Sequence, residues 1–253
     1  MSRQEEMKKL LERLEDPDER KSVAEALAGP NPQLAVKMLG LAMEIDAPVL
    51  RVRALEMIEI IGRNEKARSD SVVVLTQMAR NDKDWGVRRM STEALGNLND
   101  ETAMPALIQG LMDEDPRVHE AAIASIRKIG AKALPYLQLE LANDNPPLLK
   151  WRCIEVLKIL EIPNLAVIQQ LLPFINDKEQ IIRDETRAAI ERFRNYFYED
   201  LTRVTALLED LDPHELEENY IQVFLEILLQ TRSEKQKKAF EQALRDLFKS
   251  NNE

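Results

Sequence analysis

The sequence is short of the residues on which several protein classes depend. Its single cysteine excludes an internal disulfide. Seven glycines and 5% aromatic residues in 253 positions argue against a β-rich fold with many tight turns. No run of 18 or more apolar residues occurs, and the first 19 residues are densely charged. We therefore expect neither a secretory signal nor a membrane span, and a cytoplasmic location.

What the sequence does contain is a repeat of thirty-odd residues. Equivalent points lie 31, 37, 31, 31, 33 and 34 residues apart, at Glu19, Leu50, Val87, Val118, Leu149, Ile182 and Leu216. Four positions after each point the residue is mostly small, as at Ala54, Ser91 and Cys153, and eight positions after it the residue is always large and apolar, as at Leu27 and Ile58. Such a period is typical of a solenoid, whose units bury their apolar faces by stacking. Cys153 is therefore interpreted as a packing residue.

Each unit is predicted to be a hairpin of two helices, and residues 102–130 show the pattern. Apolar residues at helical spacing from Ala103 predict a first helix. Asp115 can cap a second helix, and Pro116 suits its first turn. Gly130 can take the positive φ that ends a helix, and Gly62 and Asn99 occupy the same place in other units.

We predict an all-α fold, a right-handed α-solenoid (α-α superhelix) of about seven hairpins in a single domain over residues 1–253. The repeats are clearest over 84–193, the seventh unit (199–230) is acidic, and a C-terminal helix over 233–249 caps the stack. First helices are expected to begin near Gln4, Pro32, Ser71, Thr102, Ala131, Leu165 and Asp200. The longest spacing falls on a polar insertion at 62–71, which we interpret as a mobile loop.

The units resemble a known repeat. The stretch from Asp115-Pro116 through Ala121-Ala122 and Ile129-Gly130, followed by Ala133-Leu134-Pro135, looks like a HEAT repeat, and is similar to the short, armadillo-like version named after phycobilisome lyases. Residues 84–107 match it nearly as well. The resemblance implies the fold and leaves the activity open, because members of this family are diverse.

No catalytic constellation or cofactor motif is recognisable, so we predict a protein without catalytic residues, cofactor or metal site. The only histidines form the pairs His119-Glu120 and His214-Glu215. Such pairs resemble the iron ligands of deoxyhypusine hydroxylases, which are also HEAT-repeat proteins. The equivalents of the first pair are Arg88-Arg89 and Lys150-Trp151, which cannot supply imidazole and carboxylate ligands.

A basic residue follows each of the first six equivalent points: Arg20, Arg51, Arg88, His119, Lys150 and Arg183. Stacking would bring these residues into a row. In one interpretation they pair with acidic residues of neighbouring turns, such as Asp84 or Asp115. In the other they form an anion-binding track.

The outward positions of the second helices are the candidate partner-binding residues, because second helices line the concave side of such solenoids. They include Arg89, Glu93, Arg127, Trp151, Glu155 and Lys158. Their signs alternate, which disfavours nucleic acid, although HEAT-like DNA glycosylases grip duplexes with a basic concave face. Trp151 is either an exposed anchor or buried between units. The same two interpretations, exposed contact or burial between units, apply to Tyr196-Phe197-Tyr198. Trp85 is interpreted as packing at a turn.

We therefore predict a non-catalytic interaction scaffold or adaptor that binds a protein or peptide on its concave face. Residues 199–226 contain nine acidic residues and one arginine, which favours a basic partner. Two alternatives remain open: a nucleic-acid-binding HEAT-like protein, and, as the resemblance implies, a subunit of a bilin lyase acting on phycobiliproteins.

Overall fold

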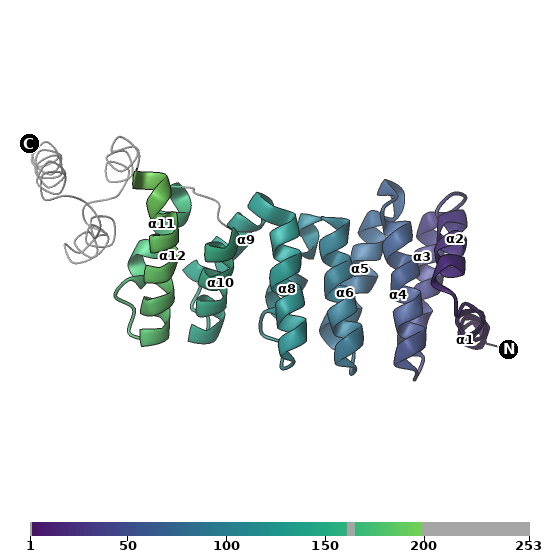
Figure 1. Cartoon of the computed structure of the whole chain (residues 1–253). Helices are drawn as coiled ribbons and strands as arrows, with labels where there is room; N and C mark the ends of the chain where they lie inside the picture. Colours follow the sequence, from purple (N-terminus) through teal and green to yellow (C-terminus); the bar gives the residue numbers. More distant parts are fainter. Residues whose placement is uncertain (1, 161–164, 199–253) are drawn as a thin grey trace, which may run out of the picture. The chain divides into compact units, whose positions relative to one another are not determined.

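The computed structural model describes residues 2–160 and 165–198, and every regular element in these ranges is helical (Figure 1). The chain divides into two compact units, Met1–Tyr136 and Leu137–Glu253, which are described separately. The predicted seventh hairpin and the capping helix lie outside the described residues.

The first unit is a stack of four helical hairpins. They are α1 (Arg3–Arg13) with α2 (Pro17–Leu27), α3 (Pro32–Gly40) with α4 (Pro48–Gly62), α5 (Glu65–Asn81) with α6 (Trp85–Leu98), and α7 (Met104–Gly110) with α8 (Pro116–Ile129), with short 3₁₀ turns η1 (Leu41–Glu44), η2 (Glu101–Ala103) and η3 (Gly130–Ala133). Each second helix packs on the next one, from α2 through α4 and α6 to α8. The first helices α3, α5 and α7 pack on one another in a second layer.

The second unit continues the same alternation. Helix α9 (Leu134–Ala142) begins in the first unit, and α10 (Pro147–Leu160), α11 (Leu165–Leu171), η4 (Leu172–Phe174) and α12 (Gln180–Tyr198) follow. Helix α10 packs directly against α12, as second helices do in the first unit. The described residues therefore contain six consecutive helix pairs, and the prediction of an all-α solenoid is confirmed.

Helix starts follow the predicted capping chemistry. Asp84 Oδ1 accepts a hydrogen bond from the Val87 amide at 3.1 Å, and Asp115 Oδ1 accepts one from the Arg117 amide at 3.0 Å. Helices α2, α4, α8 and α10 begin with a proline, whose missing amide hydrogen costs nothing in a first turn. Side-chain caps and prolines together set where the second helices begin.

The helix-ending positions are confirmed at two of three sites. Asn99 has φ 50° and Gly130 has φ 65°, so both leave the helix through positive φ. Helix α4 does end at Gly62, but this residue keeps a negative φ, so only the expected left-handed conformation is wrong there. Glycine is needed there for space instead: a Cβ at Gly62 would lie 2.7 Å from the Cβ of Ser71.

The polar insertion at 62–71 is not a loop. Helix α5 begins at Glu65 rather than near Ser71, and Asn64 caps it by accepting a hydrogen bond from the Lys66 amide at 3.0 Å. Ala67 and Ser71 are fully buried, so this part of α5 packs on the core. The extra residues lengthen a first helix to 17 residues. The polar composition of residues 62–71 suggested a loop because only one face of these helical turns is buried.

The repeat pattern describes the core of the inner hairpins. The small positions Ala54, Ser91, Ala122, Cys153 and Thr186 and the large positions Ile58, Leu95, Ile126 and Ile190 are all 0% exposed. Burial, helped by the nearby charge of Glu140, raises the pKa of the Cys153 thiol to about 12, so its role as a packing residue is confirmed.

Leu27 departs from this pattern. It was predicted as a core residue, yet it is 36% exposed. Among the residues that the structure describes, no element covers it on the side facing away from α4, whereas its equivalents Ile58 and Leu95 are enclosed by hairpins on both sides.

Candidate protein-binding surface

In the first unit, the basic residues of the predicted row lie where a first helix turns into a second helix. Arg51 is 2% exposed; its Nη1 donates to the Ile45 carbonyl at 2.7 Å, and its Nε and Nη2 grip the Asp82 carboxylate of the next hairpin, both at 2.7 Å. This bidentate geometry is the strongest that an arginine–carboxylate pair offers. Arg51 therefore stabilises its own turn and links it to the turn of the next hairpin.

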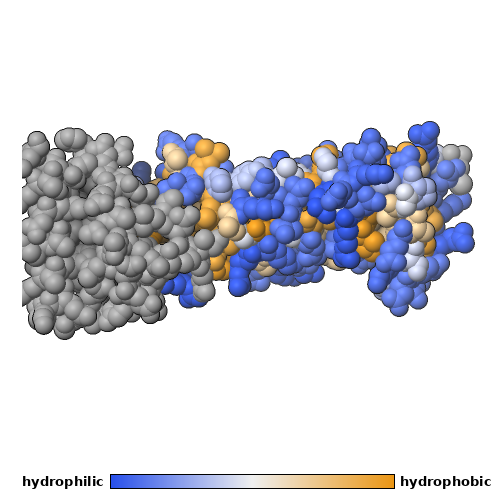
Figure 2. Space-filling view, turned by 90° about the horizontal axis from the view of Figure 1, so that it is seen from above, coloured by the Kyte–Doolittle hydropathy of each residue, from blue (hydrophilic) through white to orange (hydrophobic). Residues whose placement is uncertain are grey.

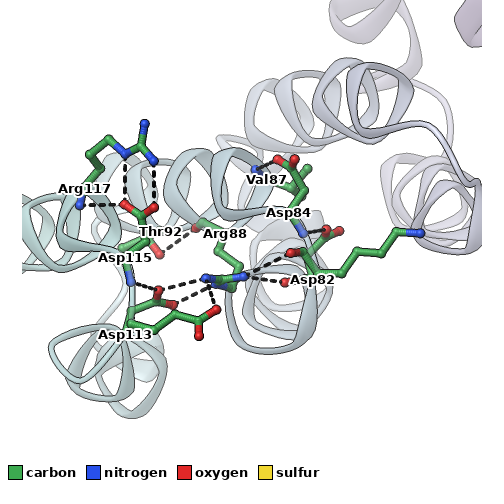
Figure 3. Close-up of polar contacts among 10 residues, drawn as sticks. Asp82, Asp84, Val87, Arg88, Thr92, Asp113, Asp115 and Arg117 are labelled. Carbon is green, nitrogen blue, oxygen red and sulfur yellow. Dashed lines mark hydrogen bonds and ion pairs between the residues drawn. The ribbon is translucent and has the colours of Figure 1, made fainter.

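Arg88 repeats the arrangement one hairpin later (Figure 3). It donates to the Asp82 carbonyl at 3.0 Å and to both Asp113 carboxylate oxygens at 2.8 and 2.9 Å. The hydrogen bonds that Arg88 donates to Asp113 raise the pKa of its guanidinium, which stays charged. Asp82 and Asp113 thus form a ladder with the two arginines, in which each aspartate also accepts a hydrogen bond from the amide two residues later.

The identity of the acidic partners corrects the sequence interpretation. We expected Asp84 and Asp115 to pair with the arginines, but these residues cap α6 and α8. The arginine partners lie two positions earlier, at Asp82 and Asp113. The turns before α6 and α8 each carry two aspartates with separate tasks, and sequence alone does not tell which of them faces the neighbouring hairpin.

Three other members of the row also donate a hydrogen bond to a backbone carbonyl that precedes their own helix. Arg20 donates to the Leu14 carbonyl at 2.9 Å and pairs with Glu56 at 2.7 Å, and Arg183 donates to the Asp177 carbonyl at 2.7 Å. His119 donates from Nδ1 to the Leu111 carbonyl at 3.0 Å. Lys150 differs, since its ammonium lies 5.9 Å from the centre of the Phe174 ring. These polar atoms are engaged within the protein, which supports the structural interpretation of the row over the anion track.

The outward face of the second helices is the candidate binding surface of the first unit. Arg89 on α6 pairs with Glu93 of the same helix at 2.6 Å, and both side chains are about two-fifths exposed, at 37% and 40%. Arg127 on α8 is exposed and has no ion-pair partner among the described residues. The three predicted residues of this unit therefore all reach the surface.

A polar row across three second helices accompanies these residues. Asn97 on α6 donates to Glu59 of α4 at 3.1 Å and accepts from Lys128 of α8 at 2.6 Å. Glu59 also accepts from Arg63 at 3.2 Å. This row, Glu59–Asn97–Lys128, presents acidic, amide and basic groups in succession and links neighbouring hairpins at their surface. This row was not identified from the sequence, because its hydrogen bonds join residues of three different hairpins.

The remaining three predicted residues lie on α10 in the second unit. Trp151 is half-buried, and the guanidinium of Arg152 lies 4.3 Å from the centre of its ring. Arg152 also pairs with Glu155 at 3.1 Å, and Lys158 pairs with Glu185 of α12. Trp151 is thus neither fully exposed nor sealed in the core. The side chains of Tyr196, Phe197 and Tyr198 lie outside the described residues.

A contact that sequence reasoning missed joins Trp85 to the following hairpin. The Arg117 guanidinium lies 3.2 Å from the centre of the Trp85 ring and also donates to both Asp115 oxygens, at 2.9 and 2.7 Å. These hydrogen bonds from Arg117 lower the pKa of the Asp115 carboxyl to about 2. Trp85 does belong to the turn, but it is 36% exposed and its ring contacts the Arg117 cation.

Residues 2–160 and 165–198 contain neither a metal-binding cluster nor a membrane-spanning helix. No group of three or more His, Cys, Asp or Glu side chains in these ranges is placed to hold a metal ion. No helix there is both long enough and apolar enough to cross a membrane. Figure 2 shows hydrophilic residues over most of the coloured surface, with hydrophobic residues in smaller patches between them. His119 of the His119-Glu120 pair is buried, and its ring contacts the Leu111 carbonyl.

Stacked helical hairpins linked by an arginine–aspartate ladder define the class of α-solenoid repeat proteins. Residues 72–158 match the family described as HEAT repeats, which confirms the predicted resemblance over this segment. A search of curated proteins finds no match.

Several solved structures are similar to this chain. One, described as the structural basis of microtubule plus end tracking by XMAP215, CLIP-170 and EB1, is 19% identical with a TM-score of 0.49, over 73% of this chain and 87% of the other. The complex of CpcE and CpcF of phycocyanin lyase from Nostoc sp. PCC7120 is 19% identical with a TM-score of 0.37, over 86% and 94%. A designed armadillo repeat protein in complex with the peptide (KR)4 is 17% identical with a TM-score of 0.34, over 87% and 98%.

Proposed function

We propose that this protein is a non-catalytic scaffold that binds a protein or peptide on the outward face of its second helices. The observation that supports the proposal best is the Glu59–Asn97–Lys128 row, in which hydrogen bonds at 3.1 and 2.6 Å hold side chains of three hairpins in fixed positions. Side chains that are already ordered lose less conformational entropy when a partner binds. The mixture of donors and acceptors suits the alternating groups of a polypeptide.

The charges of this face favour protein over nucleic acid. A phosphate backbone is bound by a run of basic side chains, because each phosphate that is neutralised contributes to affinity. On α6 and α8 the basic side chains Arg89 and Lys128 are bonded to Glu93 and Asn97, so their charge or donors are already partly satisfied. Arg127 supplies one exposed cation beside them.

We further propose that the partner is basic and that Trp151 anchors it. The acidic composition of residues 199–226 supports the first point, through electrostatic attraction. The half-buried ring of Trp151 supports the second, because a tryptophan that is partly held by its own protein and partly open is a typical binding hot spot.

A photo-crosslinking amino acid at position 127 tests the binding face. The matched control carries it at Gln77, an exposed position on the first helix α5. In extracts of the native source, a discrete protein adduct is expected from position 127 and not from position 77. Equal adducts from both positions, or an adduct only from position 77, would contradict the proposed face.

A selection from a random-peptide library tests partner chemistry and the anchor. Selected peptides are expected to be enriched in lysine and arginine and to bind Trp151→Ala more weakly, with an unfolding midpoint close to that of the unmodified protein. Trp85→Ala is the matched control and should bind as the unmodified chain does. Enrichment of acidic peptides would overturn the basic partner, and unchanged binding by a folded Trp151→Ala variant would overturn the anchor.

A further inference from the structure

The first two hairpins leave an apolar groove open between α1 and α3. Its volume is about 350 Å³, and apart from Asn31 every residue of its lining is apolar, including Met7, Leu10, Leu27, Leu34 and Met38. Leu10, Leu27 and Leu34 are 39%, 36% and 53% exposed. The exposure of three leucines to water at one site is unfavourable in free energy, and an occupant of the groove would remove this exposure.

The groove results from the packing pattern of the repeats. The residues equivalent to Leu27 in the next hairpins, Ile58 and Leu95, are 0% exposed because neighbouring helices cover them. No described element covers Leu27 in this way. The exposed leucines Leu10 and Leu34 protrude from the two helices that border the groove, so the same surface offers both projecting side chains and a space that accepts them.

The charges on α1 indicate which occupant fits the groove. Glu6, Leu10 and Arg13 are all exposed and lie on one strip of the helix, because residues four and three positions apart follow each other along a helix face. Neither Glu6 nor Arg13 makes an ion pair with a described residue. If two α1 helices lie antiparallel about an axis beside Leu10, each Glu6 faces the other copy's Arg13. The strip is therefore complementary to itself.

The distribution of net charge also favours a contact between two copies through α1. The whole chain carries −10, which makes two copies repel over most of their surface. Helix α1, in contrast, has four basic and three acidic residues in Arg3–Arg13, so this face is nearly neutral. Two copies can approach here with little repulsion.

We propose that the groove is occupied by a second copy of this chain, through an isologous antiparallel contact between the α1 helices. Leu10 and Leu34 of each copy enter the groove of the other, and two symmetry-related Glu6–Arg13 pairs close the rim. The contact area of one helix pair and its flanks is small, so the dimer is weak and dissociates on dilution.

Sedimentation velocity of the full chain over a wide range of concentrations tests this proposal. A reversible monomer–dimer equilibrium is expected. Leu10→Glu should abolish the dimer, because it places like charges at the centre of the contact. Val73→Glu is the matched control, since Val73 is 55% exposed on α5 away from the groove, and it should leave the equilibrium unchanged. Circular dichroism melts establish that each variant is folded.

Charge reversal sharpens the test. Glu6→Arg alone should raise the dimer dissociation constant by about tenfold or more, because each introduced arginine faces Arg13 of the other copy. Adding Arg13→Glu should return the constant to within about threefold of its original value, since the pair is restored with its signs exchanged. The proposal fails if the chain is monomeric at all concentrations, if Leu10→Glu dimerises as well as Val73→Glu, or if the double reversal does not recover what the single one loses. It also fails if a different protein, rather than a second copy, is crosslinked at position 10.

Discussion

Arg88 and Arg89 are neighbours in the sequence and belong to different parts of the molecule. The Arg88 side chain is 9% exposed and joins two hairpins through Asp113, whereas the Arg89 side chain is 37% exposed and pairs only with Glu93 of its own helix. One residue along an α-helix is a rotation of 100°, enough to move a side chain from the stacking edge to the outward face. The comparison teaches that position on the repeat, rather than residue type, decides whether a charge stabilises the stack or remains open to a partner.

The largest effect is expected from Arg88→Met. The change leaves the Asp113 carboxylate, whose side chain is 12% exposed, without its partner and removes a donor from the Asp82 carbonyl. Breaking a buried ion pair by removing one member costs about 3–5 kcal/mol. Urea unfolding followed by circular dichroism should show this loss, and Arg89→Met, as the matched control, should stay within about 0.5 kcal/mol of the unmodified protein.

If both methionine variants unfold at the same urea concentration, the distinction between the two arginines does not hold energetically. The double variant Arg88→Met/Asp113→Leu adds a second check. It should recover part of the stability lost by the single variant, because no charge then remains buried without a partner.

The same division recurs at Gly96 and Asn97, further along α6. A Cβ on Gly96 would lie 2.5 Å from the Cβ of Ser125 on α8, while Asn97 is exposed. Gly96→Ala therefore forces α6 and α8 apart and should cost about 1–3 kcal/mol. Asn97→Ala should change stability by less than about 0.5 kcal/mol in the same denaturation assay. A Gly96→Ala variant as stable as the unmodified protein would mean that the two hairpins can shift without loss.

Periodicity was sufficient to predict the helical hairpins, because stacking buries the same two positions of every unit. Ser91 and Leu95 were assigned to the core from spacing alone, and both are fully buried. Capping chemistry likewise placed the start of α8 at Asp115. These features depend on local residues, and local residues are what a single sequence displays.

Features that depend on a neighbouring hairpin could not be predicted in the same way. Asp82 and Asp84 are both plausible partners for an arginine, and only the packing of two turns selects Asp82. Gly62 was predicted to end a helix through positive φ, whereas α4 ends there without it and the glycine leaves room for Ser71. The stack of Arg117 on Trp85 joins residues 32 positions apart, and the available signal was a tryptophan standing where other units have proline.

A smaller effect is expected on the outward face itself. Arg89 and Glu93 are spaced i, i+4 on α6 and are bonded at 2.6 Å, but both are well exposed to solvent. A double-mutant cycle with Arg89→Ala and Glu93→Ala should give a coupling of about 0.3–0.5 kcal/mol, which falls further as salt is added. A coupling above about 1 kcal/mol would show that this pair resembles Arg88–Asp113 more than its exposure indicates.

The last prediction concerns protonation at the start of α8, where Arg117 is exposed and yet bonded to Asp115. The Asp115 pKa is lowered from 3.8 to about 2, chiefly by the side-chain hydrogen bonds from Arg117. A carboxyl with a depressed folded-state pKa contributes stability that is present above its unfolded value, here 3.8, and is lost as the pH falls from 3.8 towards about 2. Titration of the Asp115 carboxyl carbon by NMR should therefore show a midpoint near 2, and Arg117→Ala should move it up towards 3.8. Arg117→Lys separates charge from geometry: lysine keeps the positive charge but cannot donate two parallel hydrogen bonds, so an intermediate midpoint is expected. A midpoint in Arg117→Ala that stays near 2 would assign the depression to the amide at the start of α8 instead, and would make Arg117, like Arg89, a residue of the open surface.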